Sequence, residues 1–201
     1  MSGIRYKVSV EPAEEPVTLE ELKLHLKVSN TADDALITSL GKTARIFVED
    51  LTDKKLITQT IEFYLDKFPA SRSIILPVSP LSAVVIEYID AITTDLSYTT
   101  WDAANYNTDF ISRYPRISTR INVAFPSTQE EFNAVKLTLT CGYGLAADVP
   151  DIFKSAIKEL VAEMYENREN RMYTFGTSGY NVPNHVVYLL MNNKDLGFYV
   201  Q

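Results

Sequence analysis

The spacing of apolar residues changes twice along this chain of 201 residues, and that change limits the folds it can adopt. Apolar residues recur at helical spacing in residues 17–53, alternate with polar ones within residues 57–141, and return to helical spacing after Pro150. Because helical segments precede and follow the strands, the sequence predicts an α+β fold. We expect the N- and C-terminal helices to form a helical bundle, with an antiparallel β module inserted between them.

The predicted domain boundaries follow these changes in period. Residues 1–16 are expected to form an N-terminal arm, because the stretch EPAEEP disfavours a helix. The helical domain is expected to combine residues 17–56 with residues 148–192, and the inserted β module to span residues 57–147. Residues 193–201 are expected to form a C-terminal tail.

The first helix is predicted from two signals at its N-terminus. Thr18 precedes Glu21 by three residues, which is the spacing of a capping box. Val17 and Leu22 have the spacing of a hydrophobic staple across that cap. The sequence therefore predicts a short, mostly apolar helix that begins after Thr18.

A second helix is predicted to begin near residues 31–34 and to end at residues 52–53, because the carboxylates at 33 and 34 favour the positive end of the helix dipole. Its apolar residues recur at helical spacing, and they are Leu36, Ile37, Leu40, Ala44, Phe47, Val48 and Leu51. Lys42, Arg45 and Glu49 are expected mainly on the opposite, polar face.

The β module is predicted from short alternating runs between turn residues. The expected strands are residues 60–66, 73–76, 83–90, 95–101, 106–111, 116–123 and 135–141. The clearest is the last, in which alternate residues from Val135 to Cys141 give one apolar face. Pro150 suits the first turn of a further helix with an apolar stripe, and a short last helix is expected at residues 184–191.

Charge and composition argue against several classes of function. A formal net charge of −7 disfavours a surface that grips nucleic acid, which needs clustered Lys and Arg. The single cysteine, Cys141, permits no intrachain disulfide, which fits assembly in a reducing cytosol. We expect no secretory signal near the N-terminus and no membrane span, because the apolar runs are too short.

The arrangement of reactive side chains does not indicate catalysis, and we expect no catalytic, metal or cofactor site. His25 and His185 lie in different helical segments without a Cys or carboxylate at ligand spacing. Cys141 is expected to be a small buried residue on a strand face. Residues 142–144 (GYG) lack the Gly-Lys-Ser/Thr sequel of a phosphate loop and indicate a turn, and the carboxylates at 33 and 34 indicate a helix start.

Two segments near the C-terminus carry apolar and aromatic residues that indicate protein contacts, namely the loop at residues 172–182 and the tail at residues 192–201. The candidate contact residues are Met172, Tyr173, Phe175, Tyr180, Phe198, Tyr199 and Val200, together with Arg168 and Arg171. Two alternatives stay open. In the first, the loop and the tail fold back on their own subunit. In the second, the charged stretch ENRENR before the loop is a solvated helix end and makes no ion-pair network or subunit contact.

An ordered series of segments in this chain resembles a known family. The segments are VTLEELKLHLKV, DDALITSLGKTARIFVEDLTDKKLITQT, FYLDKFP, ILPVSPLSAVVIEYIDA and AVKLTLTCGYGLAADVPDIFKSAIKELVAEMYENREN, within residues 17–171. In these segments the chain resembles the head–tail connector proteins, also called adaptor or head-completion proteins, of long-tailed double-stranded DNA phages and gene transfer agents.

The resemblance implies a structural role and no enzyme activity. It implies a homo-oligomeric ring, usually of twelve subunits, that binds beneath the portal protein, extends the DNA channel and gives a platform to the next neck, stopper or tail protein. DNA would pass through the lumen without sequence-specific binding. The protein would be a virion component of the neck, at the head–tail interface, assembled in the cytoplasm of a bacterial host.

Two alternatives to a connector stay open at this point. One is a ring-forming tail-completion or tail-terminator protein, a class that is usually dominated by β structure. The other is a small ligand-binding protein or enzyme, with a site where the β module meets the helices.

Overall fold

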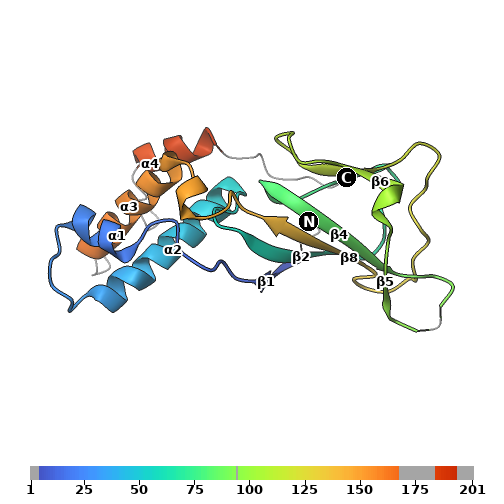
Figure 1. Ribbon diagram of the computed structural model, residues 1–201, viewed down its shortest axis with the longest axis horizontal. Coiled ribbons are helices and arrows are strands. Elements are labelled where there is room, and N and C mark those ends of the chain that lie inside the picture. The colour runs from blue at the N-terminus through green and yellow to red at the C-terminus, as the bar shows by residue number, and fades with distance from the viewer. Residues whose placement is uncertain (1–4, 94, 168–183, 194–201) are drawn as a thin grey trace, which may run out of the picture. The chain divides into compact units, whose positions relative to one another are not determined.

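The computed structural model describes residues 5–93, 95–167 and 184–193 (Figure 1). The chain divides into two compact units. A β unit holds the described residues up to Ala13 together with Thr58–Gly142, and a helical unit holds Glu14–Ile57 together with the described residues from 143 to 193. The described chain contains both helices and antiparallel sheets, so the predicted α+β fold class is confirmed.

The helical unit is built around α2 and α3, which contact each other and both remaining α-helices described. Its elements are α1 (Leu19–Leu26), α2 (Asp34–Thr52), the 3₁₀ helix η2 (Ala146–Asp148), α3 (Asp151–Glu166) and α4 (Asn184–Met191). Each α-helix contributes to one apolar core, whose buried members include Leu22, Ile37, Phe153 and Leu190. The helical segments expected from the sequence are therefore present near their expected bounds.

The N-terminus of α1 has the predicted capping box. Thr18 Oγ1 accepts a hydrogen bond of 3.2 Å from the Glu21 backbone N–H, and Glu21 Oε2 accepts one of 2.9 Å from the Thr18 backbone N–H. That second bond does most to lower the pKa of Glu21, against an opposing effect of burial. Val17 and Leu22 are both buried in the helical core. A Cβ at Gly41 of α2 would lie 2.9 Å from Leu22 Cδ1, so the missing side chain lets α1 pack closely on α2.

A buried network of charges links α2 to the segments before and after it. Glu49 Oε2 lies 3.3 Å from Arg45 Nη1 and 3.2 Å from Lys55 Nζ, and Glu49 Oε1 accepts a hydrogen bond of 3.1 Å from the Leu56 backbone N–H. Arg45 Nε donates to Glu15 Oε2 at 2.7 Å. Because each buried charge has an oppositely charged partner and a hydrogen bond, the network avoids most of the cost of an isolated buried charge.

The prediction that Arg45 and Glu49 lie on the exposed face of α2 is wrong, since both are buried. Opposite charges four residues apart on a helix are typical of a solvent-exposed pair. Here Glu15 and Lys55 come from outside the helix and complete the network. Burial acts to lower the pKa of Arg45, but the hydrogen bond to Glu15 and the charge of Glu49 outweigh it, so the pKa is raised. Phe47, expected on the apolar face, is exposed.

The β unit contains two antiparallel sheets. The larger sheet has the order β1 (Arg5–Val10), β2 (Gln59–Leu65), β8 (Val135–Cys141), β4 (Leu81–Ile89) and β5 (Tyr98–Thr100). The smaller sheet has the order β3 (Ser73–Ile75), β7 (Arg116–Thr119) and β6 (Tyr106–Asp109), and the 3₁₀ helix η1 (Ala103–Asn105) leads into β6. The segment expected as an N-terminal arm is extended, and its β1 pairs with β2 at the edge of the larger sheet.

One apolar core joins the two sheets of the β unit. It includes Ile61 of β2 and Leu137 of β8 from the larger sheet, and Ile117 of β7 from the smaller one. Aromatic rings lie at one part of this core, where Phe68 stacks on Phe125 with ring centroids 4.6 Å apart. The alternation read from the sequence therefore identified the side of β2 and β8 that faces the core.

Three strands are shorter than the alternation predicted, and the turns beside them explain why. Asp95 Oδ1 accepts the Ser97 backbone N–H at 2.6 Å, so β5 begins only at Tyr98. Asp109 Oδ1 accepts the Ser112 backbone N–H at 3.0 Å and ends β6. Asn122 has a φ of 65°, which turns the chain after β7. Asp and Asn favour such turns because their short side chains bond to nearby backbone groups.

Replacing Thr18 by Ala is expected to destabilise the helical unit by about 1 kcal/mol, because the Glu21 N–H loses its cap. The control is Thr43→Ala at an exposed position inside α2, which should cost nothing since Ala is the better helix former. Urea unfolding followed by far-UV circular dichroism measures both. The lowered pKa of Glu21 means that its contribution is present above its ordinary pKa and is lost as pH falls through the folded value. Thr18→Ala keeps the backbone N–H that does most to lower this pKa, so wild type and variant should lose this contribution alike as the pH falls.

Replacing Glu49 by Ala is expected to destabilise the helical unit by about 3–5 kcal/mol, because Arg45 and Lys55 then stay buried with less compensation. Asp50→Ala is the matched control, since Asp50 is exposed on the same helix and its loss should stay within about 0.5 kcal/mol. Guanidinium unfolding monitored by helical circular dichroism compares the two. Equal midpoints for the two variants would contradict the importance assigned to the network.

Candidate interaction surfaces

The side chains with catalytic potential have structural surroundings. Asp33 Oδ2 accepts a hydrogen bond of 2.6 Å from the Tyr165 hydroxyl, which ties the start of α2 to α3. Asp34 pairs with Lys23 of α1 at 2.6 Å. Cys141 is buried, with its Sγ 3.5 Å from the Gln59 carbonyl oxygen. These contacts tie the start of α2 to α1 and α3, and β8 to β2.

The glycines after β8 form a turn. Gly142 and Gly144 have φ values of 119° and 136°, which side-chain-bearing residues rarely adopt. A Cβ at Gly144 would overlap the carboxylate of Asp148, whose Oδ2 accepts the Leu145 backbone N–H at 2.9 Å. The two glycines therefore serve the backbone geometry of this turn.

Within the described ranges, His, Cys, Asp and Glu side chains do not gather in groups of three or more that could hold a metal ion. The helices that the structure describes are all too short or too polar to span a bilayer.

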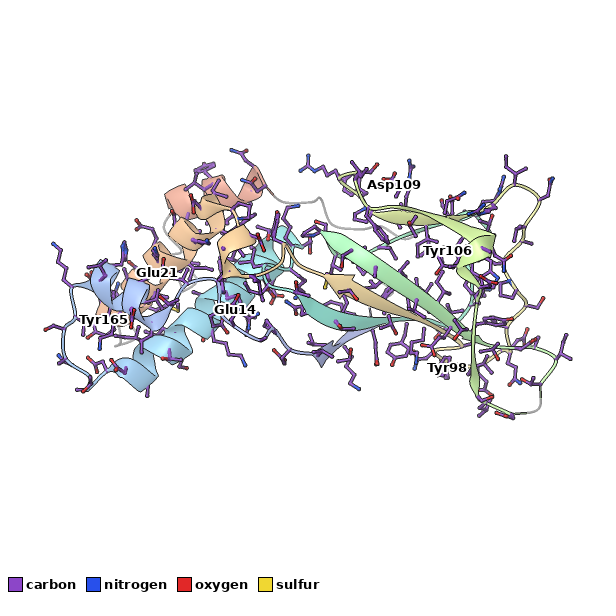
Figure 2. All side chains as sticks on the ribbon, viewed as in Figure 1. Glu14, Glu21, Tyr98, Tyr106, Asp109 and Tyr165 are labelled. Carbon is purple, nitrogen blue, oxygen red and sulfur yellow. The ribbon has the colours of Figure 1, made fainter. Side chains whose placement is uncertain are left out.

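The outer face of the larger sheet is a polar surface with its own hydrogen bonds. On one side of it, the Tyr64 hydroxyl donates to Glu62 Oε2 at 2.6 Å. On the other side, Lys136 Nζ lies 2.8 Å from Glu87 Oε2 and 4.7 Å from the centre of the Tyr98 ring, which is labelled in Figure 2. The hydrogen bond to Glu62, together with burial, raises the pKa of Tyr64 to about 12. The charged and aromatic groups on this face are therefore already paired with one another.

The short helix α4 leaves several large apolar side chains exposed. Val186 and Leu190 are fully buried in the helical core, while Tyr188 is 72% exposed and Leu189 and Met191 are also exposed. The sequence carried a signal for this surface in VVYLLM, six consecutive apolar residues at 186–191. A helix that is apolar on all sides cannot bury every side chain against one neighbour. We therefore add the exposed face of α4 to the candidate contacts.

The residues singled out from the sequence as contacts lie outside the described residues. They are Arg168, Arg171, Met172, Tyr173, Phe175, Tyr180, Phe198, Tyr199 and Val200. Their role stays a prediction. In sequence, α4 lies between the two segments that contain them.

Comparison with protein families identifies one match. The family described as phage gp6-like head-tail connector protein matches residues 16–99, which include α1, α2 and the first strands that follow them. The resemblance to head–tail connector proteins is therefore confirmed over these residues. No curated protein matches the chain closely enough to count as a relative.

Several solved structures share the fold over nearly the whole chain. One is a chain from the neck of an empty gene transfer agent particle computed with C6 symmetry, at 20% identity, a TM-score of 0.78 and 98% coverage of both chains. A second, from the virion of a native gene transfer agent particle, has 19% identity, a TM-score of 0.79 and the same coverage. A third, from the neck of a native particle computed with C12 symmetry, has 20% identity and a TM-score of 0.68, covering 96% of this chain and 98% of that one.

Replacing Glu62 by Ala is expected to lower the pKa of Tyr64 from about 12 toward its ordinary value of 10, because the hydrogen bond is its main cause. A raised pKa means that the fold favours the neutral phenol, so this contribution to stability is present below pH 10 and is lost as pH rises through 12. NMR titration of ¹³C-labelled tyrosine measures the shift, with Tyr64→Phe to assign the signal. Glu87→Ala, the weaker contributor, should change the pKa less. An unchanged pKa in Glu62→Ala would refute the assigned cause.

Proposed function

We propose that this chain, related through residues 16–99 to the phage gp6-like head–tail connector proteins, is a structural subunit of the neck that joins a virion's head to its tail. The family match carries this proposal. The shared fold with neck proteins of gene transfer agents supports it over the remaining length of the chain. The role is one of assembly and needs no catalytic residue.

We propose further that copies of the chain form a closed ring of twelve. The similar neck structures were computed with C6 and C12 symmetry, and both symmetries are compatible with twelve copies. A ring of this kind is built from heterologous contacts, in which one face of each subunit meets a different face of the next. Each subunit therefore needs two distinct surfaces that fit one another.

The ring would bind the portal protein on one side and the next neck, stopper or tail protein on the other. The exposed apolar face of α4, formed by Tyr188, Leu189 and Met191, supports a docking role in the helical unit. Apolar groups at this exposure gain free energy when a partner covers them. The aromatic residues of segments 172–182 and 192–201 are proposed to take part in the same contact.

DNA would pass through the lumen of the ring without being held there. The net charge of −7 supports this, since carboxylates repel phosphates and favour sliding over binding.

The test is negative-stain electron microscopy of the purified protein, alone and mixed with its portal protein. We expect closed rings, or portals that carry a ring of this protein. The triple variant Tyr188→Ser, Leu189→Ser, Met191→Ser should lose portal binding, because it removes the apolar contact. Leu24→Ser is the matched control, since Leu24 is exposed on α1 and outside the proposed contact.

Circular dichroism checks that both variants keep their helices. A wild-type protein that forms no ring and leaves the portal bare would overturn the proposed function. If the triple variant binds the portal like wild type, α4 is not part of the portal contact, and the proposed ring is unaffected.

A further inference from the structure

The loops at one end of the larger sheet form an exposed surface that is both acidic and apolar. This acidic loop end consists of Ile92, Asp95 and Leu96 between β4 and β5, and of Glu130, Glu131 and Phe132 before β8. Ile92 is 89% exposed and Phe132 is 78% exposed. Among the described residues, Glu130 and Glu131 make no ion pair.

The acidic loop end is held in place by hydrogen bonds between its two loops. The Ala91 N–H donates to the Ser127 carbonyl oxygen at 3.2 Å, and the Tyr98 hydroxyl donates to the Asn133 carbonyl oxygen at 2.7 Å. The Asn133 N–H in turn donates to Asp66 Oδ1 at 2.9 Å. Ile92 and Phe132 are thus presented to solvent from loops that bond to one another, which favours a docking surface.

The outer face of the smaller sheet has the opposite charge. This arginine face consists of Arg72, Arg116 and Arg120 with the exposed residues Ile75 and Ile121. In the register of the sheet, Ile75 of β3 lies beside Arg116 of β7. A hollow of about 520 Å³ opens on this face, lined by Arg72, Arg116 and Ile121 among others.

The arginine face keeps a positive excess after its internal pairing. Arg116 Nε lies 3.2 Å from Asp109 Oδ2, and hydrogen bonds from Ser112, followed by this arginine, lower the pKa of Asp109. Arg72 Nη2 donates to the Thr119 and Arg120 carbonyl oxygens at 3.1 and 2.7 Å, and these acceptors carry no charge that would offset that of the arginine. Arg120 makes no ion pair within the part of the chain that the structure describes. Both surfaces therefore hold charges that lack a partner within the described chain.

We propose that the acidic loop end of one copy docks on the arginine face of the next copy, with Glu130 and Glu131 against Arg116 and Arg120. Phe132 would pack beside Ile121 at the edge of the hollow. The proposal rests on the ring proposed above and identifies the two surfaces that its subunits join.

The two surfaces lie on opposite sides of the β unit. In Figure 2, Tyr98 beside the acidic loop end and Asp109 beside the arginine face are labelled at opposite edges of this unit. A subunit therefore cannot satisfy both surfaces by itself, and pairing between copies runs head to tail. Exposed ion pairs contribute little free energy singly, so the charges set the register while the covered apolar residues add affinity.

DNA phosphate is the other occupant that arginines could bind. It would leave Ile92, Leu96 and Phe132 uncovered, and the neighbouring carboxylates would repel it. A second copy of this chain satisfies the charges and the apolar residues of both surfaces at once, so the observations favour it.

The test uses two charge-reversed chains. One carries Glu130→Lys and Glu131→Lys, and the other carries Arg116→Glu and Arg120→Glu. Each chain alone is expected to give at least about tenfold less ring than wild type at equal concentration, because like charges meet at every contact. A one-to-one mixture should restore rings, since the reversed loop of one chain fits the reversed face of the other and their unreversed surfaces also fit. Such rings alternate the two chains, as an even number of subunits permits.

Ring yield is measured by mass photometry and negative staining, with the portal as template. Glu11→Lys with Asp50→Lys is the control for net charge, at exposed positions outside both surfaces, and it should assemble like wild type. Rings from both reversed chains alone, or no rescue on mixing, would overturn the proposed contact while the ring itself stands. The proposed contact would also be overturned if the Arg116→Glu, Arg120→Glu chain forms normal rings but binds less DNA than wild type, because the arginine face would then bind phosphate. Absence of rings in wild type would instead overturn the proposed function.

Discussion

The carboxylate of Glu49 is the interaction on which the helical unit depends most. It forms ion pairs with Arg45 of α2 and with Lys55, and it accepts a hydrogen bond from the Leu56 backbone N–H in the segment that follows α2. Arg45 extends the same network to Glu15, before α1. Because removing a partner would leave a buried charge uncompensated, the network favours the arrangement that keeps these segments together. In the proposed function, this arrangement would hold α4 in one orientation toward a partner.

The β unit is stabilised mainly by apolar packing between its two sheets. Its two sheets share one apolar core, and polar residues on the outer faces bond to one another. The surfaces left for partners are therefore loops and sheet faces whose backbones are already fixed. Preformed surfaces lose little conformational entropy on binding, so a modest contact area can hold copies together in a ring.

Local patterns were enough to predict most elements of the fold, because the signals are local. The capping box at Thr18, the alternation from Val135 to Cys141 and the apolar stripe after Pro150 each depend on neighbours within a few residues. The connector resemblance also came from such segments. The position of Arg45 and Glu49 could not be predicted in this way, because their partners are brought together only by folding. The exposed contact surfaces escaped prediction for a similar reason, since exposure depends on what the neighbouring elements leave uncovered.

The sequence by itself determined the helices, most of the strands, the α+β class and the resemblance to head–tail connectors that the family match confirms over residues 16–99. Hydrophobic period, caps and turn residues act over short distances, so they can be read directly from the order of residues. Only the tertiary structure decided which charges are buried together and which face of α4 stays open. It alone decided that an acidic and an arginine-rich surface lie on opposite sides of the β unit. These properties arise from contacts between residues far apart in the chain, and no local pattern encodes them.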